Sequence, residues 1–517
     1  MNRHQCCAPL SGQTMQREQT WKWFGEAPLD LLVIGGGIVG AGVARDAAMR
    51  GLRVGLVEQH DFAFGTSSRS SRLLHGGLRY LAQGRIGLVR EASIEKTIVH
   101  RIAPHLAEPL PFLFPTYRGN RHWVLWQLKI GVKVYDFLCR GRNLGQSTWL
   151  EPGEVLERMP GLAEAGLNGG VRYYDGLTND ARLVLDTLRS AARSGAGIVN
   201  YGRFTEATRT ADWECRLEDC LTGNVTRVRS RALVNATGPW AEQVPHSRVK
   251  LRLTKGIHLV VSRDRLAVPD SVVMTEDKRI LFAIPWGERV ILGTTDTDYN
   301  GSLDRITADA SDVAYVLEIA NQFFPRARLT SSDVIGTWAG VRPLIAAPGG
   351  KPSDISRSHE IRNPEPGWWD VAGGKLTTYR LMAEQTVDQI ARWLQRTRTP
   401  RPAFRPCRTA DEPLLTPAER AEVSGILPPP FERRVVEHYC ANEWAVHLDD
   451  VMVRRTSWQY YCRDARQRAE QTADWMGECL GWSEATRAAE LHRYEAAVDL
   501  AAISGGSAPT DGTMRTG

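Results

Sequence analysis

The chain has 517 residues, enough for two or three domains, and its 42% hydrophobic and 24% charged residues are those of an ordinary globular protein. A formal net charge of +6 is small for this length, so composition excludes neither a nucleic acid nor a membrane surface as partner and by itself suggests neither. Nine cysteines at irregular spacing indicate free thiols in a reducing compartment and match no metal-binding pattern.

Residues 1–27 precede the first predicted element. They contain neither the apolar core of a signal peptide nor a small-residue cleavage site. The longest strongly apolar stretch, residues 29–44, is interrupted by five glycines and is too short to span a bilayer. We therefore expect a disordered extension over 1–27 and a cytoplasmic location.

The pattern of residues 29–58 is typical of a dinucleotide-binding βαβ unit. A short apolar run precedes three glycines with the G-x-G-x-x-G spacing, Gly35, Gly37 and Gly40. Gly35 permits a tight turn and Gly37 lets the backbone approach a pyrophosphate, whereas Gly40 lets the next helix pack close to the strand. The N-terminus of that helix, with its unpaired N–H groups and positive dipole, then faces the phosphates.

An acid follows the second strand of this unit. The strand covers 53–57, and Glu58 stands where a carboxylate accepts hydrogen bonds from an adenosine ribose. The next segment, 61–81, provides small and hydroxyl-bearing residues that let a flat or bulky ligand approach the backbone. These residues are Thr66, Ser67, Ser68, His75, Gly76 and Gly77. The same composition suits a solvent-exposed loop, so the residues by themselves leave both interpretations open.

The middle of the chain predicts a second sheet. An amphipathic helix is expected over 180–194, with Asn179 or Asp180 as its N-cap. Strands dominate from there to residue 295. Those of the second sheet are predicted over 251–262, 280–285 and 289–293.

Two further turns suit a dinucleotide. A strand over 231–236 runs into Thr237 and Gly238, a turn placed to pass the adenosine and pyrophosphate half of a cofactor. A later strand, 369–372, ends in a glycine pair before a helix that begins near Thr377, which repeats the logic of the opening unit. The backbone donors of this turn suit the ring carbonyl or ribityl chain of a flavin and belong to Gly373, Gly374, Lys375, Leu376 and Thr377.

Several motifs, in chain order, resemble those of the FAD-dependent glycerol-3-phosphate dehydrogenases. The resemblance begins with the glycine turn and with TSSxSSxLxHGGLRYL over 66–81, and extends to about residue 396. Later segments that carry it are DGLTNDARLV (175–184), NATGPW (235–240), KGIHLVV (255–261), EDKRILFAIPW (276–286), GTTD (293–296), AGVRPL (339–344) and GGKLTTYR (373–380). It implies bound FAD, with the isoalloxazine near the HGGLRY segment. No histidine or cysteine occupies an evident flavin-attachment motif, so we expect the FAD to be bound without a covalent link.

The resemblance also implies an α/β fold. An FAD-binding Rossmann-like domain of the glutathione-reductase and amino-acid-oxidase type is interleaved with a mixed-sheet substrate domain over 28–396, and an all-helical domain follows. The FAD-binding segments are expected at about 28–100, 165–240 and 335–396, and the substrate-sheet segments at about 101–164 and 241–334. A Pro/Arg-rich linker (397–430), the helical domain (431–504) and a disordered tail (505–517) complete the expected order.

A substrate phosphate needs fixed positive donors, and arginine matches its geometry. Arg79, Arg342 and Arg357 are candidates, although each of these arginines also suits a surface ion pair. The resemblance implies that Arg342 and Arg357 hold the phosphate and that Arg79 and Tyr80 line the same pocket.

The implied reaction is oxidation of sn-glycerol 3-phosphate to dihydroxyacetone phosphate by hydride transfer to FAD, with electrons passed to ubiquinone or menaquinone. His258, which matches the family's KGxH segment, is the first choice for the base that takes the hydroxyl proton, and Lys375 is its competitor. An oxidase that reduces O2 to H2O2 and an amine oxidase on the same fold are alternatives. A flavin-binding scaffold without turnover has no need of His258, Arg342 and Lys375 together.

The resemblance further implies peripheral association with the inner face of the cell membrane, no nucleic-acid partner and no metal; a homodimer stays open. Basic and aromatic residues on one predicted helix and its approach are the candidates for membrane contact, together with the linker arginines. These are Arg118, Arg121, Trp123, Trp126, Lys129 and Lys133, and the segment 392–408. A buried amphipathic helix and a solvated connector are the alternatives.

Overall fold

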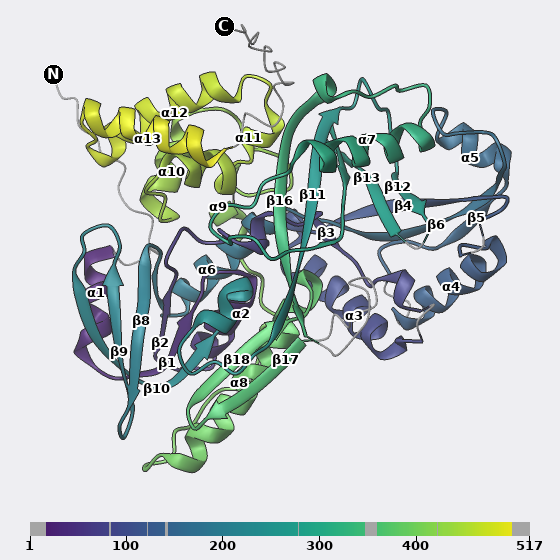
Figure 1. The fold of residues 1–517 in the computed structure, drawn as a ribbon. Helices are drawn as coiled ribbons and strands as arrows, with labels where there is room; N and C mark the ends of the chain where they lie inside the picture. Colours follow the sequence, from purple (N-terminus) through teal and green to yellow (C-terminus); the bar gives the residue numbers. More distant parts are fainter. Residues whose placement is uncertain are drawn as a thin grey trace, which may run out of the picture.

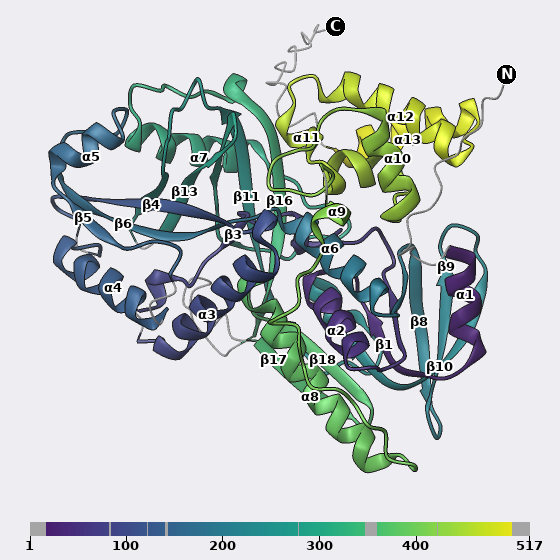
Figure 2. The ribbon, with the colours of Figure 1, turned by 180° about the vertical axis from the view of Figure 1, so that it is seen from behind.

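The computed structural model describes residues 17–81, 84–120, 122–139, 143–277, 279–346, 359–420 and 422–498. In this part of the chain, two β-sheets lie beside each other and a group of C-terminal helices packs against the first sheet's helices and the second sheet's edge (Figure 1). The view from behind shows the C-terminal helices above the first sheet (Figure 2). This arrangement is the expected α/β fold with an added helical part.

The first sheet carries the dinucleotide-binding unit. Its order is β17-β18-β10-β1-β2-β7, with β9 paired to β10 and β8 to β9. The five strands from β18 to β7 are parallel, and the others pair antiparallel. The strands are β1 (Leu29–Ile34), β2 (Val54–Val57), β7 (Gly197–Val199), β8 (Gly202–Arg209), β9 (Trp213–Asp219), β10 (Val225–Asn235), β17 (His359–Glu365) and β18 (Trp368–Gly373).

Three helices cover one face of this sheet, α2 (Ile38–Met49), α6 (Asp180–Arg193) and α8 (Tyr379–Thr397), and their apolar residues form one core with the central strands. The side chain of Asn179 accepts a hydrogen bond from the backbone nitrogen of Arg182, so Asn179, rather than Asp180, is the N-cap of α6.

The opposite face is covered by a helix where a disordered extension was expected. Residues 17–26 form α1 (Arg17–Glu26), which buries Phe24 in a core with β8, β9 and β10. Arg17 donates to Asp219 at 2.5 Å, and Arg53 lies 3.8 Å from the ring centroid of Trp23. The expectation of disorder is therefore wrong for residues 17–26, because aromatic residues in a polar stretch find apolar partners far away in the sequence.

The second sheet follows the order β15-β11-β14-β13-β12-β4-β6-β3, with β16 paired to β11 and β5 to β6. The strands are β3 (Leu73–Leu74), β4 (Glu108–Tyr117), β5 (Thr148–Leu150), β6 (Leu167–Leu177), β11 (Leu251–Ser262), β12 (Ser271–Glu276), β13 (Arg279–Trp286), β14 (Arg289–Gly293), β15 (Thr297–Asp298) and β16 (Val334–Ile345). β6 and β16 fall in segments expected to bind FAD, yet they pair antiparallel along β4 and β11 in this sheet.

Helices lie on both sides of the second sheet (Figure 1). α5 (Pro152–Arg158) and α7 (Ala310–Phe323) share one apolar core with it. α3 (Ile86–Ile102) and α4 (Leu125–Leu138) contribute to the core on the other side. Short helical turns join these elements; they are η1 (Thr66–Ser68), η2 (Leu78–Tyr80), η3 (Pro104–Leu106), η4 (Gly238–Gln243), η5 (Ser331–Asp333) and η7 (Leu376–Thr378).

The expected linker packs against the first sheet's helices. Arg45 donates to the backbone oxygens of Thr409 and Glu412 at 3.0 and 2.7 Å, and Leu414 and Leu415 are buried in the sheet's core. A connector with little contact is therefore the wrong interpretation for the described part of 397–430. Proline and arginine composition resembles that of a linker, but the polar backbone of this segment is bonded by side chains from α2 and α6.

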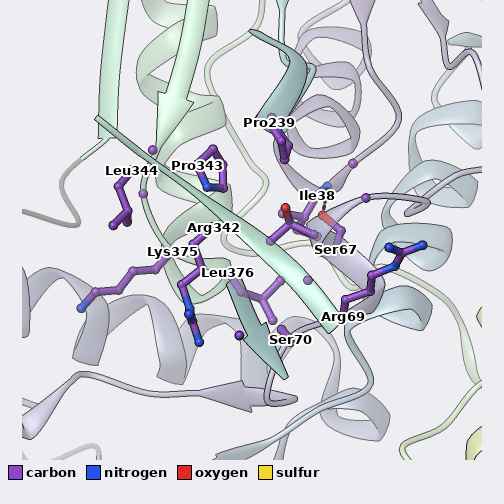
Figure 3. A pocket seen from close by; sticks show the side chains of 18 of the residues that line it. Ile38, Ser67, Arg69, Ser70, Pro239, Arg342, Pro343, Leu344, Lys375 and Leu376 are labelled. Carbon is purple, nitrogen blue, oxygen red and sulfur yellow. Dashed lines mark hydrogen bonds between the residues drawn. The ribbon is translucent and has the colours of Figure 1, made fainter. Parts of the chain in front are cut away.

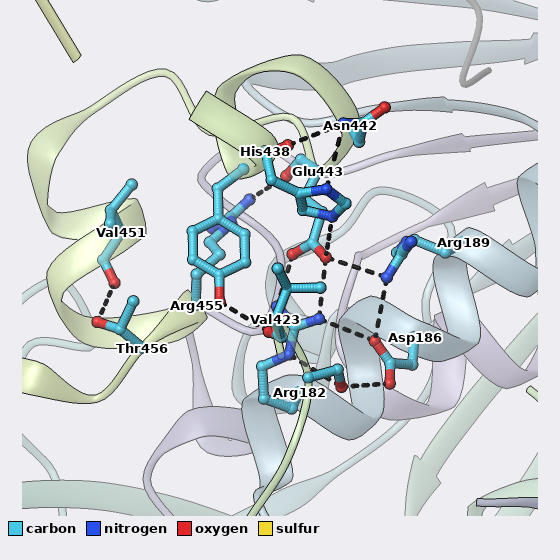
Figure 4. A network of polar contacts seen from close by, with 12 residues as sticks. Arg182, Asp186, Arg189, Val423, His438, Asn442, Glu443, Val451, Arg455 and Thr456 are labelled. Atoms are coloured by element: carbon cyan, nitrogen blue, oxygen red, sulfur yellow. Dashed lines mark hydrogen bonds and ion pairs between the residues drawn. The ribbon is translucent and has the colours of Figure 1, made fainter. Parts of the chain in front are cut away.

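The C-terminal helices form their own core, which includes Tyr439, Trp458 and Tyr494. They are α9 (Pro417–Arg420), α10 (Arg433–Asn442), the π-helix η8 (Asp450–Arg455), α11 (Trp458–Tyr461), α12 (Ala465–Leu480) and α13 (Glu484–Ala497). Buried ion pairs attach them to the first sheet's part of the molecule. Arg182 of α6 binds Glu443 through both terminal nitrogens at 2.5 and 2.9 Å (Figure 4), and Asp61 accepts bonds from Arg454 and Arg455.

Candidate functional site

A cavity of about 1430 Å³ lies between the two sheets. The carboxyl ends of β1, β2, β10 and β18 supply one wall, and β11, β13 and β16 supply another. β1 lies between β2, which follows it in the chain, and β10, which comes much later, so the connections from β1 and β10 leave in different directions. A ligand crevice at the carboxyl ends of such strands is the usual site of dinucleotide binding.

The opening glycine turn has the shape that a pyrophosphate needs. Gly35 has a φ of +109°, which favours glycine, and a Cβ on Gly40 would lie 1.9 Å from the backbone oxygen of Gly35. Gly37 is the N-cap of α2 and offers no side chain to the helix N-terminus. The Ile38 backbone nitrogen donates to Ser67 Oγ at 3.1 Å (Figure 3), so Ser67 stands at the helix N-terminus where an anion would bind.

Glu58 lies at the same end of the cavity. Its carboxylate accepts hydrogen bonds from the backbone nitrogens of Gly36 at 2.7 Å and His60 at 2.9 Å. Burial raises the pKa of Glu58, and these two backbone donors oppose that rise. The carboxylate is thereby oriented at the edge of β2, where a ribose would lie. Thr237 and Gly238 line the facing wall.

The HGG turn and the GGK turn meet at the other end. Thr377 Oγ1 accepts a hydrogen bond from the His75 backbone nitrogen at 3.0 Å, and the Lys375 Nζ lies 4.3 Å from the ring centroid of Tyr80. Gly77 has a φ of +84°, and a Cβ there would lie 2.5 Å from the Tyr80 ring. Any larger residue at position 77 would collide with the Tyr80 ring.

The other predicted cofactor residues are divided between the wall and the layer behind it. Thr66, Gly373, Gly374 and Leu376 line the cavity, and Thr66 donates to the backbone oxygen of Val341 at 2.6 Å. Among the described residues, Gly40, Ser68 and Gly76 lie outside that lining. The Gly76 nitrogen donates to Tyr135 Oη at 2.8 Å, so this part of the HGG turn is held from behind by α4.

Arg342 projects from β16 over Gly256 of β11. Its Nη2 donates to Thr294 Oγ1 at 2.9 Å, and its Nη1 donates to the backbone oxygen of Thr295 at 3.2 Å. Arg342 and Lys375 lie on the same side of the cavity, opposite Ile38 and Ser67 (Figure 3). The structure thus brings two cationic side chains together, away from the end that suits a pyrophosphate.

His258 is nearly fully buried on β11, opposite Gly293 of β14 and Trp338 of β16. Its Nε2 is 2.7 Å from Ser71 Oγ, and its ring stacks on Trp338 with a centroid separation of 5.2 Å. Burial, then the positive charges of Arg342 and Arg72, hold the pKa of His258 well below its ordinary value. The imidazole is therefore neutral at pH 7 and is available to accept a proton.

Two predicted substrate residues lack a described side chain. Arg357 lies outside the described residues, and Arg79 is placed only as a member of η2. Conversely, the sequence interpretation missed Ser71 and Thr294, which bond His258 and Arg342. Ser71 lies in TSSxSSxL and Thr294 in GTTD, two motifs that carry the family resemblance. Those motifs could have identified both residues.

FAD fits this site. One end has a glycine cradle, a helix N-terminus and an oriented acid. The other end has two glycine turns joined by a hydrogen bond, beside the cationic Lys375 and the neutral His258. These features define an FAD-dependent oxidoreductase. The family model for FAD-dependent oxidoreductases matches residues 30–389, and that for the C-terminal domain of alpha-glycerophosphate oxidase matches 419–487. The chain belongs to the FAD-dependent glycerol-3-phosphate dehydrogenase and oxidase family.

Similar proteins cover most of the chain. A glycerol-3-phosphate dehydrogenase of Mycobacterium leprae is 35% identical over 96% of this chain and 94% of its own length. The aerobic glycerol-3-phosphate dehydrogenase of Staphylococcus saprophyticus is 37% identical over 75% of this chain and 71% of its own length. The structure of the glycerol-3-phosphate dehydrogenase from Bacillus halodurans, complexed with FAD, superposes with a TM-score of 0.75 at 29% identity, covering 94% of this chain and 98% of that one.

Proposed function

We propose that the protein oxidises sn-glycerol 3-phosphate to dihydroxyacetone phosphate and passes the electrons to a membrane quinone. One observation carries the proposal: an arginine fork and a lysine stand with a buried, neutral histidine in the cavity that holds the cofactor crevice. An anionic alcohol needs this set, because the phosphate requires fixed cations and the hydroxyl requires a proton acceptor.

Arg342 binds the phosphate in this proposal, and Lys375 adds a second positive charge. Bound FAD supplies the two-electron acceptor for the C2 hydrogen. His258 takes the C2 hydroxyl proton. Its low pKa keeps the ring neutral before substrate arrives, and the charge of a bound phosphate dianion raises that pKa toward the working pH.

Lys375 is the weaker candidate for the base. Its ammonium group lies over the Tyr80 ring, and a cation–π contact stabilises the charged form. A lysine can act as a base only in its neutral form. Because the contact with Tyr80 stabilises the charged form, it makes Lys375 a poorer base. Anaerobic flavin reduction across pH tests the assignment with His258→Asn and Lys375→Met. We expect His258→Asn to reduce its flavin much more slowly and Lys375→Met to bind substrate more weakly. A wild-type rate and pH profile of flavin reduction in His258→Asn would make Lys375 the base.

A membrane quinone as acceptor requires a membrane-facing surface, and α4 offers one. Trp126, Ile130 and Phe137 are 60, 57 and 81% exposed on this helix, and Lys129 and Lys133 lie 5.6 and 5.7 Å from the neighbouring Trp149 ring. Aromatic and basic side chains on one helix face suit the interface of an anionic bilayer. Among the described helices, none combines the length and apolarity needed to cross a membrane.

The cavity also has an apolar wall on this side of the molecule. Phe112, Phe114 and Phe282 of the second sheet line it, and Trp123, at the approach to α4, packs on Phe114 with a centroid separation of 5.3 Å. A polar substrate gains no binding energy from such a wall, whereas the apolar ring of a quinone can pack on it. The linker arginines are less suited to lipid contact, since Arg398 and Arg408 pair with acids of this chain.

Two measurements test the acceptor and the surface. Glycerol 3-phosphate should bleach the flavin anaerobically, and a soluble quinone should restore the colour faster than air does. Equally fast recovery in air would favour the oxidase. Trp126→Glu combined with Phe137→Glu should abolish flotation with anionic vesicles, whereas Leu221→Glu, an exposed apolar residue far from α4, should not. Flotation that survives the double substitution would move the contact elsewhere.

A further inference from the structure

A buried cation lies close to the histidine proposed as base. The Arg72 side chain is only 1% exposed, and its guanidinium lies 4.3 Å from the Trp286 ring centroid and 5.3 Å from that of Trp338. Trp338 is also the ring on which His258 stacks, at 5.2 Å and an interplanar angle of 20°. These two spacings place the charge no more than about 10.5 Å from the imidazole.

The charge and the hydrogen-bond donors of Arg72 are only partly matched by partners. Its Nη2 donates to Ser457 Oγ at 2.9 Å, but Nε and Nη1 have no hydrogen-bond partner in the described part of the chain. Asp180 is 4.0 Å away, and its oxygens accept bonds from the backbone nitrogens of Ser70 and Ala181 instead. A buried cation with unmet donors is destabilising, and an apolar side chain would fill the space between two tryptophans without that penalty.

The partner of Arg72 comes from the C-terminal helices. Ser457 lies in the turn between η8 and α11, and that turn is fixed by the ion pair between Arg455 and Asp61. Both Arg72 and Ser457 have left-handed backbone, with φ of 57° and 61°, although neither is glycine. Strained backbone of this kind persists where the surroundings determine it and is concentrated at functional sites.

We infer that Arg72 is a positioning residue of the active site: held by Ser457 of the C-terminal helices, it fixes Trp338 against His258 and maintains a positive charge beside that ring. The inference rests on the proposed role of His258. It makes the C-terminal helices part of the site that handles the substrate proton, although none of the proposed substrate-binding or catalytic residues comes from them.

Two cations act on His258, Arg342 from β16 and Arg72, and their net effect is to lower its pKa. Each cation has an acid beside it, since Asp296 lies 3.3 Å from Arg342 and Asp180 lies 4.0 Å from Arg72. Ser71 and Gly293 beside the ring are neutral, and Tyr460 of α11 packs on Trp338. Two cations disfavour a third, so each keeps the imidazole unprotonated. Loss of Arg72 should therefore let His258 gain a proton at higher pH.

The test uses the holoprotein with Arg72→Met, Arg72→Lys and Ser457→Ala. The His258 ring is titrated by NMR after 15N-histidine labelling, with His258→Asn identifying the signal, and anaerobic flavin reduction is followed over the same pH range. Arg72→Met should raise the titration midpoint by roughly one pH unit, the effect of one charge at about 10 Å with an effective dielectric of about 20. The acid limb of flavin reduction should move by the same amount, and Arg72→Lys should restore both.

The outcomes separate the two proposals. An unchanged His258 titration in a folded, FAD-loaded Arg72→Met protein overturns the inference, as would an equal shift in Arg90→Met, an exposed arginine of α3. If Arg72→Met does not fold, Ser457→Ala tests the inference instead. It removes only the hydrogen bond from Arg72 to Ser457, and the His258 titration midpoint must still move. If the titration moves while the reduction profile stays fixed, the charge of Arg72 still acts on the His258 ring, but His258 is refuted as the base.

Discussion

Replacing Arg342 by lysine should weaken binding of glycerol 3-phosphate strongly and leave FAD content unchanged. The arginine fork is held at the cavity wall by bonds from both terminal nitrogens, to Thr294 at 2.9 Å and to Thr295 at 3.2 Å. A lysine ammonium is a compact point charge, so it does not reproduce a planar fork that bonds the wall and a phosphate together.

The size of the effect follows from the bonds lost. One charge-assisted hydrogen bond is worth about 1.5 to 3 kcal/mol, which corresponds to roughly 10- to 150-fold in kcat/KM. The assay is anaerobic flavin bleaching at increasing glycerol 3-phosphate concentration. Arg252→Lys is the matched control, because Arg252 pairs with Asp298 on an exposed part of β11. Wild-type affinity in Arg342→Lys, or a wild-type enzyme that oxidises glycerol as readily as its phosphate, would refute the assignment.

Three other expectations concern the cofactor and the fold. Acid precipitation should release all the FAD, since the chain lacks an evident attachment motif; colour retained in the pellet would show a covalent bond. Gly40→Ala should lower FAD content, because the new Cβ would lie 1.9 Å from the Gly35 oxygen, whereas Gly87→Ala, in open space, should not. Asp61→Asn should lower the free energy of unfolding by about 3 to 5 kcal/mol, since the buried Arg455 loses its anionic partner while Arg454 keeps Asp449 and Asp450; an unchanged thermal midpoint would contradict this.

Local patterns were sufficient for the dinucleotide-binding unit. The glycine spacing predicts a helix directly after the turn, which is α2, and the predicted second strand, 53–57, matches β2 within a residue. Each of these signals lies within a few positions of the element it specifies. The same holds for β11, β13 and β14, whose apolar and β-branched runs mark strands without reference to distant residues.

Contacts between distant segments account for the errors. α1 depends on Asp219 and on a core built from β8 to β10, and the segment after α8 depends on donors such as Arg45. Neither signal exists in the local sequence, where both stretches are polar. Arg72 shows the same limit at the site: by residue type it suits the surface, and only the fold places it between two tryptophans.

The interleaved order of the two sheets has a consequence for synthesis on the ribosome. β1 pairs with β10, and β10 with β18, so the sheet that begins at residue 29 is completed only when residue 373 has emerged. Until then, residues 233–235 of β10 lack the strand that pairs with them on the side away from β1, and the crevice lacks Gly373 and Gly374. A nascent chain stopped before β18 would therefore present an open strand edge to other chains. On this geometry, the complete crevice can hold FAD only after Gly373 and Gly374 have emerged.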